Sequence, residues 1–538
     1  MWQCNLEAIF PTGNAAVIHR SQFRDVEIPD TPVWKLVMER FERYGERLAI
    51  VDGPSGQGIT YARMLCDVER AANGLHAAGL RCGDVFAFCC PNLPEYGVAL
   101  LAVNRLGGVA TTMNPMYTAE EIAHQLRETR AQFLLTVPAL VERCLEACKG
   151  TAVREVISVG AAPGTTEFAT LLTADGELPE VERDVRTHLA ALPYSSGTSG
   201  VPKGVMLSDY NVVAQLQQAQ VMLTRKEGDV LLAVLPFFHI YGLMLILLDG
   251  LRHGATLVSM QRFDLLPFLE CVQRHRVTVA PLVPPIVLAL AKHPAVDQYD
   301  LSSLEKIMCG AAPLGAEVEH ACAQRLGCQI MQGYGMTEFA GATLTRPPGE
   351  ETRKTGSVGC CWPSMQARLV SVESGQDVGI GQPGELLMRG PNVMQGYFER
   401  PEATRETLVD GWLRTGDIAC VDEDGDFFIV DRVKELIKYN AYQIAPAELE
   451  AVLLRHPAVA DAAVIPSPDE EAGEVPKAFV VLKARADTQS ILDFVAGHVA
   501  PYKKIRRIAV VDAIPKSPSA KILRRVLIQQ ERAAASES

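Results

Sequence analysis

Short apolar runs alternate with amphipathic segments in the early part of the chain, and this alternation restricts the fold more than any other feature. Residues 85–88, 108–111 and 133–136 are predicted to be strands, and residues 96–106 carry apolar side chains at helical spacing. The sequence Thr118-Ala119-Glu120-Glu121 is a capping box, which predicts the start of a further helix. Strands that alternate with helices are typical of α/β units built on parallel sheets.

The same pattern extends in both directions. Upstream, Thr31-Pro32 is predicted to cap a helix at 33–41, and a strand at 48–51 precedes a long helix predicted from Thr60 to residue 78. Downstream, a helix is predicted at 263–275, together with strands at 231–235, 255–258, 277–281 and 306–309. Because 538 residues exceed one typical core, we expect two α/β subdomains here.

From about residue 355 the pattern changes to short strands and turns. Asp424-Gly425 predicts a hairpin turn within a β-rich subdomain whose strands are expected at 367–370, 384–389, 418–421 and 427–430. The rest of the chain predicts a small α+β C-terminal domain, with helices at 445–456 and 488–499 and strands near 459–465 and 478–482. The expected fold class is therefore α/β, with a large N-terminal domain and a small C-terminal one.

The apolar stretch at 230–248 is long enough to cross a membrane, but Pro236, His239 and Gly242 interrupt it. We therefore predict a buried strand, a loop at His239 and a buried helix. No signal peptide is evident, and the 14 cysteines lack the paired spacing of a disulfide framework or zinc site. The net charge of −13 argues against a nucleic-acid partner. These features predict a cytoplasmic protein with free thiols and no integral membrane association.

Residues 195–204 form a glycine- and hydroxyl-rich stretch between two apolar runs. Its glycines allow the backbone to approach a ligand closely, and successive N–H groups in such a turn form an anion-binding nest. The hydroxyls and the ammonium of Lys203 are donors suited to phosphate. The stretch is not a Walker A loop, because Pro202 precedes Lys203. The alternative is a surface hairpin loop, since Gly and Ser are ordinary turn residues.

Four later motifs carry groups that suit the same kind of ligand. Tyr334-Gly335-Met336-Thr337-Glu338 offers a hydroxyl and a carboxylate suited to phosphate and Mg²⁺, and Asp417 follows a turn where it suits the hydroxyls of a ribose. The other two are the charged segment 431–438 and the lysine-containing segment 516–525. Each motif has an ordinary explanation as well. In the order given, these are a helix cap, a turn residue, a solvated charged face and a surface lysine. Their joint occurrence in this order is the stronger signal.

With these motifs the chain resembles the acyl-CoA synthetases of the adenylate-forming superfamily over roughly residues 25–530. Among its members it looks most similar to 4-coumarate–CoA ligases, in residues 192–207, 235–241 and 443–450. The resemblance implies a two-step reaction that uses ATP, Mg²⁺ and coenzyme A. A carboxylate first attacks the α-phosphorus of ATP, and the CoA thiol then attacks the acyl-AMP. It also implies an N-terminal domain over 1–432 and a mobile C-terminal domain over 434–538 that rotates about a hinge at Lys434.

The resemblance further implies the residues of the site. Catalytic groups would be Lys521, His239, Lys438, Gln443 and Thr337, and the metal ligand would be Glu338. The nucleotide would contact Ser195, Ser196, Gly197, Thr198, Ser199, Gly200, Lys203, Gly310, Ala311, Ala312, Pro313, Gln332, Gly333, Tyr334, Gly335, Met336, Thr337, Asp417, Arg432, Lys434 and Lys521. The acid would contact His239, Tyr241, Met244, Leu245, Gly310, Gly333, Phe339, Ala340 and Gly341. Coenzyme A would contact Tyr439, Asn440 and Ala441.

Three residues depart from the family pattern. Ala441 and Ala520 stand where glycine is usual, and Asn440 replaces a common lysine that contacts CoA. A methyl group at Ala441 would narrow the path of the CoA arm, so thioester formation is the step that these departures affect most.

A largely apolar pocket wall suits a hydroxycinnamic acid such as 4-coumarate, with a medium- or long-chain fatty acid as the alternative. An enzyme that loads acyl-AMP onto a carrier protein is a further alternative within the superfamily. An alternative that is not an enzyme is a nucleotide-binding regulator that lacks catalysis. The joint presence of Lys521, Glu338 and Asp417 argues against this alternative. The expected state is a monomer or a homodimer.

Overall fold

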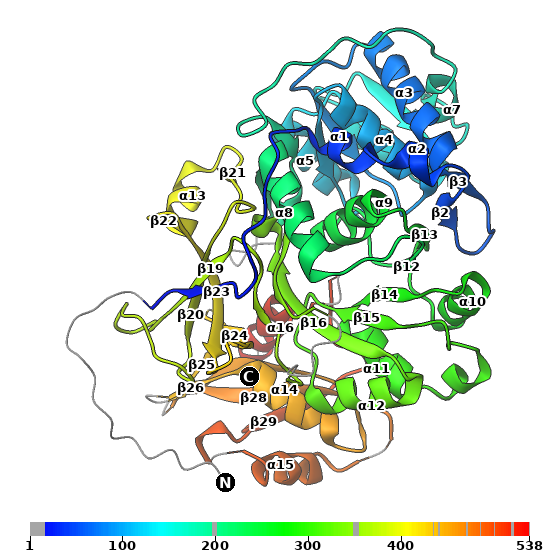
Figure 1. The fold of residues 1–538 in the computed structure, drawn as a ribbon. Helices are drawn as coiled ribbons and strands as arrows, with labels where there is room; N and C mark the ends of the chain where they lie inside the picture. Colours follow the sequence, from blue (N-terminus) through cyan, green and yellow to red (C-terminus); the bar gives the residue numbers. More distant parts are fainter. Residues whose placement is uncertain are drawn as a thin grey trace.

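The computed structural model describes residues 17–195, 202–347, 354–433, 435–439, 442–469, 472–484, 486–499, 501–517 and 521–536. Within these residues the strands form four sheets, three in the N-terminal part of the chain and one in the C-terminal part (Figure 1). Helices cover the first two sheets, which confirms the predicted α/β class with a large N-terminal and a small C-terminal domain.

The first sheet has the strand order β10-β11-β9-β5-β4-β6-β7-β8, and β21 pairs with β11. Its members are β4 (Val85–Phe88), β5 (Val109–Thr112), β6 (Phe133–Thr136), β7 (Glu155–Ser158), β8 (Thr166–Glu167), β9 (Leu189–Ala191), β10 (Tyr194–Ser195), β11 (Lys203–Ser208) and β21 (Gly396–Tyr397). Strands β4 to β7 pair in parallel, as the alternation predicted. The connecting helices are α4 (Pro94–Arg105), α5 (Ala119–Thr129), α6 (Val141–Cys148) and α7 (Phe168–Leu171).

The second sheet has the order β18-β17-β16-β15-β14-β12-β13-β2-β3. Its members are β2 (Leu48–Asp52), β3 (Gly58–Thr60), β12 (Val230–Ala233), β13 (Thr256–Ser259), β14 (Val279–Leu282), β15 (Lys306–Cys309), β16 (Gln329–Met336), β17 (Gly341–Thr345) and β18 (Cys360–Cys361). Its helices include α3 (Tyr61–Ala77), α8 (Asp209–Met222), α9 (Asp249–Arg252), α10 (Leu265–His275), α11 (Pro284–Lys292) and α12 (Ala316–Leu326). The early strands β2 and β3 thus join a sheet whose other strands come much later in the chain.

The third sheet is the predicted β-rich subdomain, with the order β1-β19-β20-β23-β22 and β24 paired to β23. Its members are β1 (His19–Arg20), β19 (Gln366–Val370), β20 (Gly384–Arg389), β22 (Leu408–Val409), β23 (Trp412–Val421) and β24 (Phe427–Arg432), and α13 (Pro401–Thr407) packs beside it. The predicted hairpin turn joins β23 to β24, with Gly425 at a φ of 77°. The lead-in before residue 30, which the sequence predicted to be irregular, contributes β1 to this sheet (Figure 1).

The C-terminal domain has a separate apolar core and a sheet of the order β26-β25-β28-β27, with β29 parallel to β28. Its strands are β25 (Ile437–Tyr439), β26 (Tyr442–Ile444), β27 (Val459–Asp469), β28 (Gly473–Leu482) and β29 (Arg507–Val510), and its helices are α14 (Pro446–Arg455), α15 (Thr488–Ala496) and α16 (Arg524–Ser536). In Figure 1 this domain, in orange and red, lies beneath the second sheet and the β-rich subdomain.

The apolar segment 230–248 forms β12, a turn that contains His239, and a π-helix over Tyr241–Leu248 whose side chains are buried after Tyr241. The predicted strand, loop and buried helix are therefore confirmed, although the helix is of the π type. Across the described ranges, none of the helices is both long and apolar enough to cross a membrane.

The predicted cap at Thr31-Pro32 is wrong. The helix at 33–41 is divided into α1 (Val33–Met38) and α2 (Phe41–Tyr44), and the residue at the N-cap is Pro32, whose side chain makes no capping hydrogen bond. The carboxylate of Asp209 accepts the hydrogen bond of the Val33 N–H instead, at 2.9 Å. A residue distant in sequence thus does what a local cap would do.

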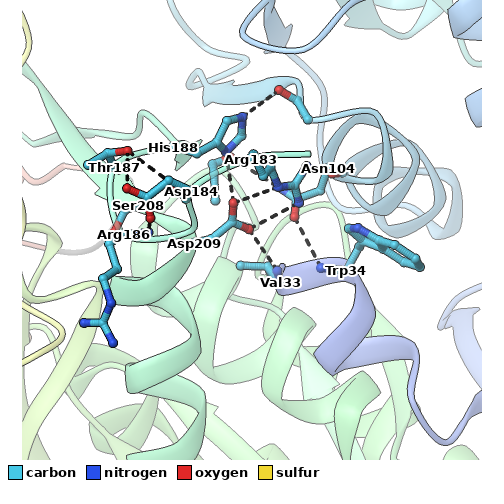
Figure 2. Close-up of polar contacts among 12 residues, drawn as sticks. Val33, Trp34, Asn104, Arg183, Asp184, Arg186, Thr187, His188, Ser208 and Asp209 are labelled. Atoms are coloured by element: carbon cyan, nitrogen blue, oxygen red, sulfur yellow. Dashed lines mark hydrogen bonds and ion pairs between the residues drawn. The ribbon is translucent and has the colours of Figure 1, made fainter. Parts of the chain in front are cut away.

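Asp209 is the centre of a buried polar cluster that joins three parts of the N-terminal domain (Figure 2). Its carboxylate lies 3.1 Å from Arg183 Nε and 2.9 Å from His188 Nδ1. The second ring nitrogen of His188 lies 2.9 Å from the carbonyl oxygen of Gly107. His188 thus bridges Asp209 of α8 and the backbone at Gly107.

Candidate active site

The loop 310–313 follows the carboxyl end of β15, the position where open α/β sheets bind ligands. Ala311 adopts a φ of 70°, a left-handed conformation that is uncommon for a residue with a Cβ. The side chain of Gln332 donates to the carbonyl oxygen of Leu314 at 3.1 Å and accepts from its N–H at 3.2 Å. Gln332 therefore fixes the end of this loop, and its amide is already satisfied by protein groups.

Tyr334, Asp417 and Arg432 meet across β16, β23 and β24. The Tyr334 hydroxyl donates to Asp417 Oδ2 at 2.7 Å, and Arg432 Nε lies 3.1 Å from Asp417 Oδ1. Asp417 and Arg432 are also directly opposite in the antiparallel pair. Burial, and secondly the charge of Asp417, raise the pKa of Tyr334, which keeps its hydroxyl a donor. The structure thus brings together three residues that the resemblance assigned to one nucleotide.

Glu338 is the middle residue of a short 3₁₀ helix, Thr337–Phe339, and is buried. Its Oε1 accepts hydrogen bonds from the Ser195 hydroxyl and the Tyr397 hydroxyl, each at 2.9 Å. Lys203, the first residue of β11, holds its ammonium 4.7 Å from the centre of the Tyr397 ring. The two apolar runs that flank the glycine-rich stretch lie in β9 and β11, which pair antiparallel, and β10 pairs with the start of β11. The stretch itself, with Ser196, Gly197, Thr198, Ser199 and Gly200, lies outside the described residues.

Lys521 reaches these groups from the C-terminal domain. Its pKa is lowered, first by burial and then by the positive charge of Arg432, while the carboxylates of Asp417 and Glu338 act in the opposite direction. Burial, and secondly the charge of Lys521, lower the pKa of His239 to about 4. His239 is therefore neutral at pH 7, and its Nδ1 accepts the N–H of Tyr241.

For the other residues predicted in the C-terminal domain, the described part of the structure records no contact with the groups named above. Lys438 is exposed on β25, and its N–H donates to Glu474. Tyr439 on the same strand stacks its ring against Arg506, at 5.2 Å. The backbone of Gln443 pairs with Lys438, but its side chain is outside the described part of the structure. Lys434, Asn440, Ala441 and Ala520 are likewise outside the described residues.

Six of the predicted acid-binding residues fall into two groups, one around Tyr241 and Gly310 and the other at residues 339–341. Tyr241 donates its hydroxyl to the carbonyl oxygen of Met308 at 2.9 Å, and its ring lies close to Gly310, 3.2 Å from where a Cβ on that glycine would stand. Gly333 is part of β16 in the same region. Of the other group, Phe339 and Ala340 are fully buried, and Ala340 has a φ of 55°. Gly341, with a φ of 143°, lies beside the side chain of Gln215.

Met244 and Leu245 are not brought to Tyr241 and Gly310 by any recorded contact of the described residues. Met244 lines a small cavity with Val33 and Leu100, and the carbonyl oxygen of Leu245 accepts from Arg225. Both residues lie further along the π-helix, which packs against α8, β12 and β17 and so buries its side chains in the core. That they form part of the pocket wall stays a prediction.

Two residues near the site were missed by the sequence analysis. Tyr397 contacts Glu338 and Lys203, as described above. Gln215 accepts from Asn392 through Oε1, while its buried Nε2 has no hydrogen-bond partner among the described residues. Nothing in their local sequence marks either residue, because both reach the site only through tertiary packing.

Within the described ranges, no three His, Cys, Asp or Glu side chains gather as a metal cluster. A single carboxylate such as Glu338 fits Mg²⁺ that takes its other ligands from phosphate oxygens and water.

The architecture and the site can be compared with those of known proteins. The profile of AMP-binding enzymes matches residues 37–398, and the profile of their C-terminal domain matches residues 448–521. The chain is 44% identical over 524 residues to 4-coumarate–CoA ligase 5 of Oryza sativa subsp. japonica, which covers 95% of this chain and 96% of the relative. It is 42% identical over 527 residues to 4-coumarate–CoA ligase 2 of Petroselinum crispum, with 95% and 96% covered.

Among solved structures, the fold matches that of the anthranilate CoA ligase AuaEII in complex with anthranoyl-AMP. The TM-score is 0.88 at 26% identity, and the match covers 95% of this chain and 99% of the other. With family profiles on both domains and relatives that match along nearly their whole length, the chain belongs to the family of AMP-binding enzymes.

Proposed function

We propose that the protein is an AMP-forming acid–thiol ligase that converts a carboxylic acid, ATP and coenzyme A into an acyl-CoA thioester through an acyl-AMP intermediate. The observation that carries this proposal is that the charge of Lys521, in one domain, interacts electrostatically with Arg432, Asp417, Glu338 and His239 of the other, the groups that we propose to bind the nucleotide and the acid. The relatives named 4-coumarate–CoA ligases support the same reaction.

In the first step the protein binds ATP at the ends of β15, β16 and β11. Asp417, held by Tyr334 and Arg432, accepts hydrogen bonds from the ribose hydroxyls, and the loop 310–313 borders the base. The stretch 195–204, with Lys203 at its end, contacts the outer phosphates. Glu338 would hold Mg²⁺, with Thr337 beside it on the nucleotide, and the metal would supply positive charge against the leaving pyrophosphate.

Lys521 lies between the attacking carboxylate and the α-phosphate, where it draws the two anions together. A lysine–phosphate pair at about 4 Å contributes on the order of 4 kcal/mol at an effective dielectric near 20. Burial, and secondly the charge of Arg432, lower the pKa of Lys521 in the absence of substrate. A bound nucleotide adds negative charge next to both cations and so favours the charged form of this lysine.

In the second step we propose that the domain formed by residues 434–538 rotates about Lys434 relative to residues 1–432. Lys438 and Gln443 contact the substrates in the first orientation, and Tyr439, Asn440 and Ala441 line the path of the CoA arm in the second. His239, neutral because of its lowered pKa, borders the acyl carbonyl without adding a positive charge there. The exposure of Lys438 in the present structure is compatible with such a change of contacts.

We propose a hydroxycinnamic acid such as 4-coumarate as the substrate. The Nε2 of Gln215 has no hydrogen-bond partner in the described part of the chain and lies 3.1 Å from where a Cβ on Gly341 would stand, which favours an acid with a polar acceptor at its far end. A medium- or long-chain fatty acid, which offers no such acceptor, is the second candidate. A carrier protein in place of CoA is the third, because Ala441 occupies a usual glycine position.

The proposal also covers the setting in which the enzyme works. The thirteen cysteines of the described residues are all free, which suits a reducing compartment such as the cytoplasm.

The test is AMP release from ATP and Mg²⁺ with a panel of hydroxycinnamic, benzoic and fatty acids, with and without CoA, with products identified by mass. We expect CoA-dependent turnover and a hydroxycinnamoyl-CoA product. Acyl-AMP that accumulates equally with and without CoA would indicate carrier loading, and fatty acyl-CoA would identify the second candidate. The absence of AMP with every acid would contradict the proposal.

A further inference from the structure

We infer that Tyr397 is a positioning residue for the metal and phosphate end of the site: its hydroxyl orients Glu338 and its ring supports Lys203. The inference rests on the proposed function, because that proposal gives Glu338 and Lys203 their roles. Tyr397 would act through these two residues.

The backbone around Tyr397 holds its side chain in one place. The strand β21 pairs with β11, so Tyr397 is opposite Val205, close to the start of the strand that carries Lys203. The N–H of Tyr397 donates to the hydroxyl of Thr404 in α13 at 2.9 Å. The ring is 6% exposed. Both the backbone and the ring of Tyr397 are thus fixed by protein contacts.

The hydroxyl of Tyr397 determines how Glu338 presents its carboxylate. Oε1 accepts from both Tyr397 and Ser195 at 2.9 Å, whereas no hydrogen bond to Oε2 is recorded within the described ranges. Two donors on one oxygen fix the plane of the carboxylate and leave Oε2 for a cation. The Tyr397 hydroxyl is the donor in this contact, because an ionised carboxylate only accepts hydrogen bonds.

The ring of Tyr397 supports Lys203. The ammonium lies 4.7 Å from the ring centre, within the range of a cation–π contact. This contact holds the charge at the end of the glycine-rich stretch before any phosphate arrives. Tyr397 therefore links the proposed metal ligand to the proposed phosphate-binding lysine, and the hydroxyl contact can be removed while the ring contact is kept.

The chain offers a matched control in Tyr194. Its hydroxyl also donates to a buried carboxylate, Glu128 Oε2 at 2.7 Å, and it lies on β10 at the same corner of the sheet. Glu128 pairs with Arg400 and has no recorded contact with Glu338. Tyr194→Phe therefore removes a hydrogen bond of the same kind without touching the metal and phosphate end.

The experiment measures the affinity of the full-length protein for α,β-methylene-ATP by calorimetry, with Mg²⁺ and with a chelator. The ratio of the two affinities reports the contribution of the metal, independently of turnover. In Tyr397→Phe we expect this ratio to fall about tenfold, as for the loss of a group that orients a metal ligand. Tyr194→Phe should keep the wild-type ratio, and neither change should alter the affinity in chelator.

Tyr397→Leu removes the ring as well as the hydroxyl. We expect the same loss of the Mg²⁺ contribution and an additional weakening of about threefold in the chelator, because Lys203 loses its support. The KM for the carboxylic acid should stay at the wild-type value in all three variants, because the residues that Tyr397 supports are proposed to bind metal and phosphate and not the acid.

The outcomes separate the inference from the function on which it rests. If the wild-type protein shows no Mg²⁺-dependent gain in affinity, the proposed nucleotide site itself is wrong. If the wild type shows the gain and Tyr397→Phe retains all of it, only the role of Tyr397 is overturned. An equal loss of the Mg²⁺-dependent gain in Tyr397→Phe and Tyr194→Phe would also overturn the role of Tyr397. Both changes would then act by destabilising the part of the sheet around β10 and β11.

Discussion

At the scale of single residues, Lys521 carries the largest share of the proposed first step. Lys521→Ala removes the cation that draws the carboxylate and the α-phosphate together, so acyl-AMP formation should slow by up to about a thousandfold. The measurement is acid-dependent pyrophosphate exchange. Lys503→Ala, which removes a lysine paired with Glu448 in the same domain, should leave the rate unchanged.

The same lysine change tests whether the two half-reactions use different faces of the C-terminal domain. Lys521→Ala supplied with synthetic acyl-AMP and CoA should form the thioester at close to the wild-type rate, because this lysine acts only in the first step. An unchanged rate of acyl-AMP formation in Lys521→Ala would contradict the account of the first step.

His239 makes the stability of the protein depend on pH in a defined range. Its folded pKa of about 4 lies below the unfolded value of about 6.5, so the unfolded chain binds more protons between these values. The contribution to the free energy of unfolding is therefore complete above about pH 6.5 and is lost as the pH falls towards 4.

This dependence is measured as the difference between wild type and His239→Gln in denaturant unfolding at a series of pH values. The shift of about 2.5 units sets an upper limit of about 3 kcal/mol for the difference, and residual solvent exposure reduces it to about 2 kcal/mol. A difference between the two proteins that does not change between pH 4 and 6.5 would show that His239 is not held in its neutral form by its surroundings.

Residue types at the site were largely predictable, but their pairing was not. The sequence placed Tyr334, Asp417 and Arg432 in motifs suited to a nucleotide, and the structure brings them into one hydrogen-bonded group. The contact of Tyr397 with Glu338 joins residues 59 positions apart. No local pattern reports such a contact, because it follows from how β21 docks on β11.

At the scale of elements, the Asp209 cluster joins α1, α8 and the segment around His188 (Figure 2). Asp209 is fully buried, and the side chains of Arg183 and His188 are 3% and 11% exposed. Asp209→Ala would leave both basic groups without their anion. We expect the free energy of unfolding to fall by about 3–5 kcal/mol, as measured by denaturant titration.

Asp30→Ala is the control for this change, because it breaks an exposed ion pair with Arg186 and should cost less than about 1 kcal/mol. Equal effects of Asp209→Ala and Asp30→Ala would mean that the buried cluster is solvated.

Elements with local signals were predicted well, and those defined by distant partners were not. The capping box at Thr118 and the N-cap at Thr60 mark the helices α5 and α3 because their hydrogen bonds are made within one turn. The cap of α1 comes from Asp209, and β1 forms only by pairing with β19. The helix α16 was not predicted, although it covers β27. Such elements depend on contacts between residues distant in sequence, which local sequence patterns do not indicate.

At the scale of the whole molecule, Asp431 ties the two domains together in the present orientation. Its Oδ2 accepts the N–H of Ala447 in the first turn of α14, so a carboxylate at the end of the β-rich sheet caps a helix of the C-terminal domain. Nearby, Arg524 pairs with Glu435 and Glu450. Burial raises the pKa of Asp431 to about 6.

If the C-terminal domain rotates as proposed, Asp431→Ala should weaken the present orientation and slow acyl-AMP formation about fivefold, the effect of one lost helix cap. Thioester formation from supplied acyl-AMP should not slow. Asp431→Asn, which keeps an acceptor oxygen, is the matched control. Equal slowing of both half-reactions by Asp431→Ala would show that this contact supports the fold and not one orientation.

The arrangement of domains was predictable only in part. Composition and periodicity indicated two α/β subdomains, a β-rich subdomain and a small α+β domain, and the four sheets confirm them. The orientation in which Lys521 approaches Asp417 was not predictable. It depends on a few contacts such as that of Asp431, whose free energies are small compared with those of the two separate cores.

The most direct test of the proposed ligase reaction follows the carboxylate oxygens of the acid. The full-length protein is given 4-coumarate with isotopically labelled carboxylate oxygens, ATP, Mg²⁺ and CoA, and the AMP is analysed by mass spectrometry. If the carboxylate attacks the α-phosphorus, one labelled oxygen remains on AMP after the thiol displaces it. We predict one label per AMP and an acyl-CoA product. AMP without label, or turnover that yields ADP and phosphate, would contradict the account.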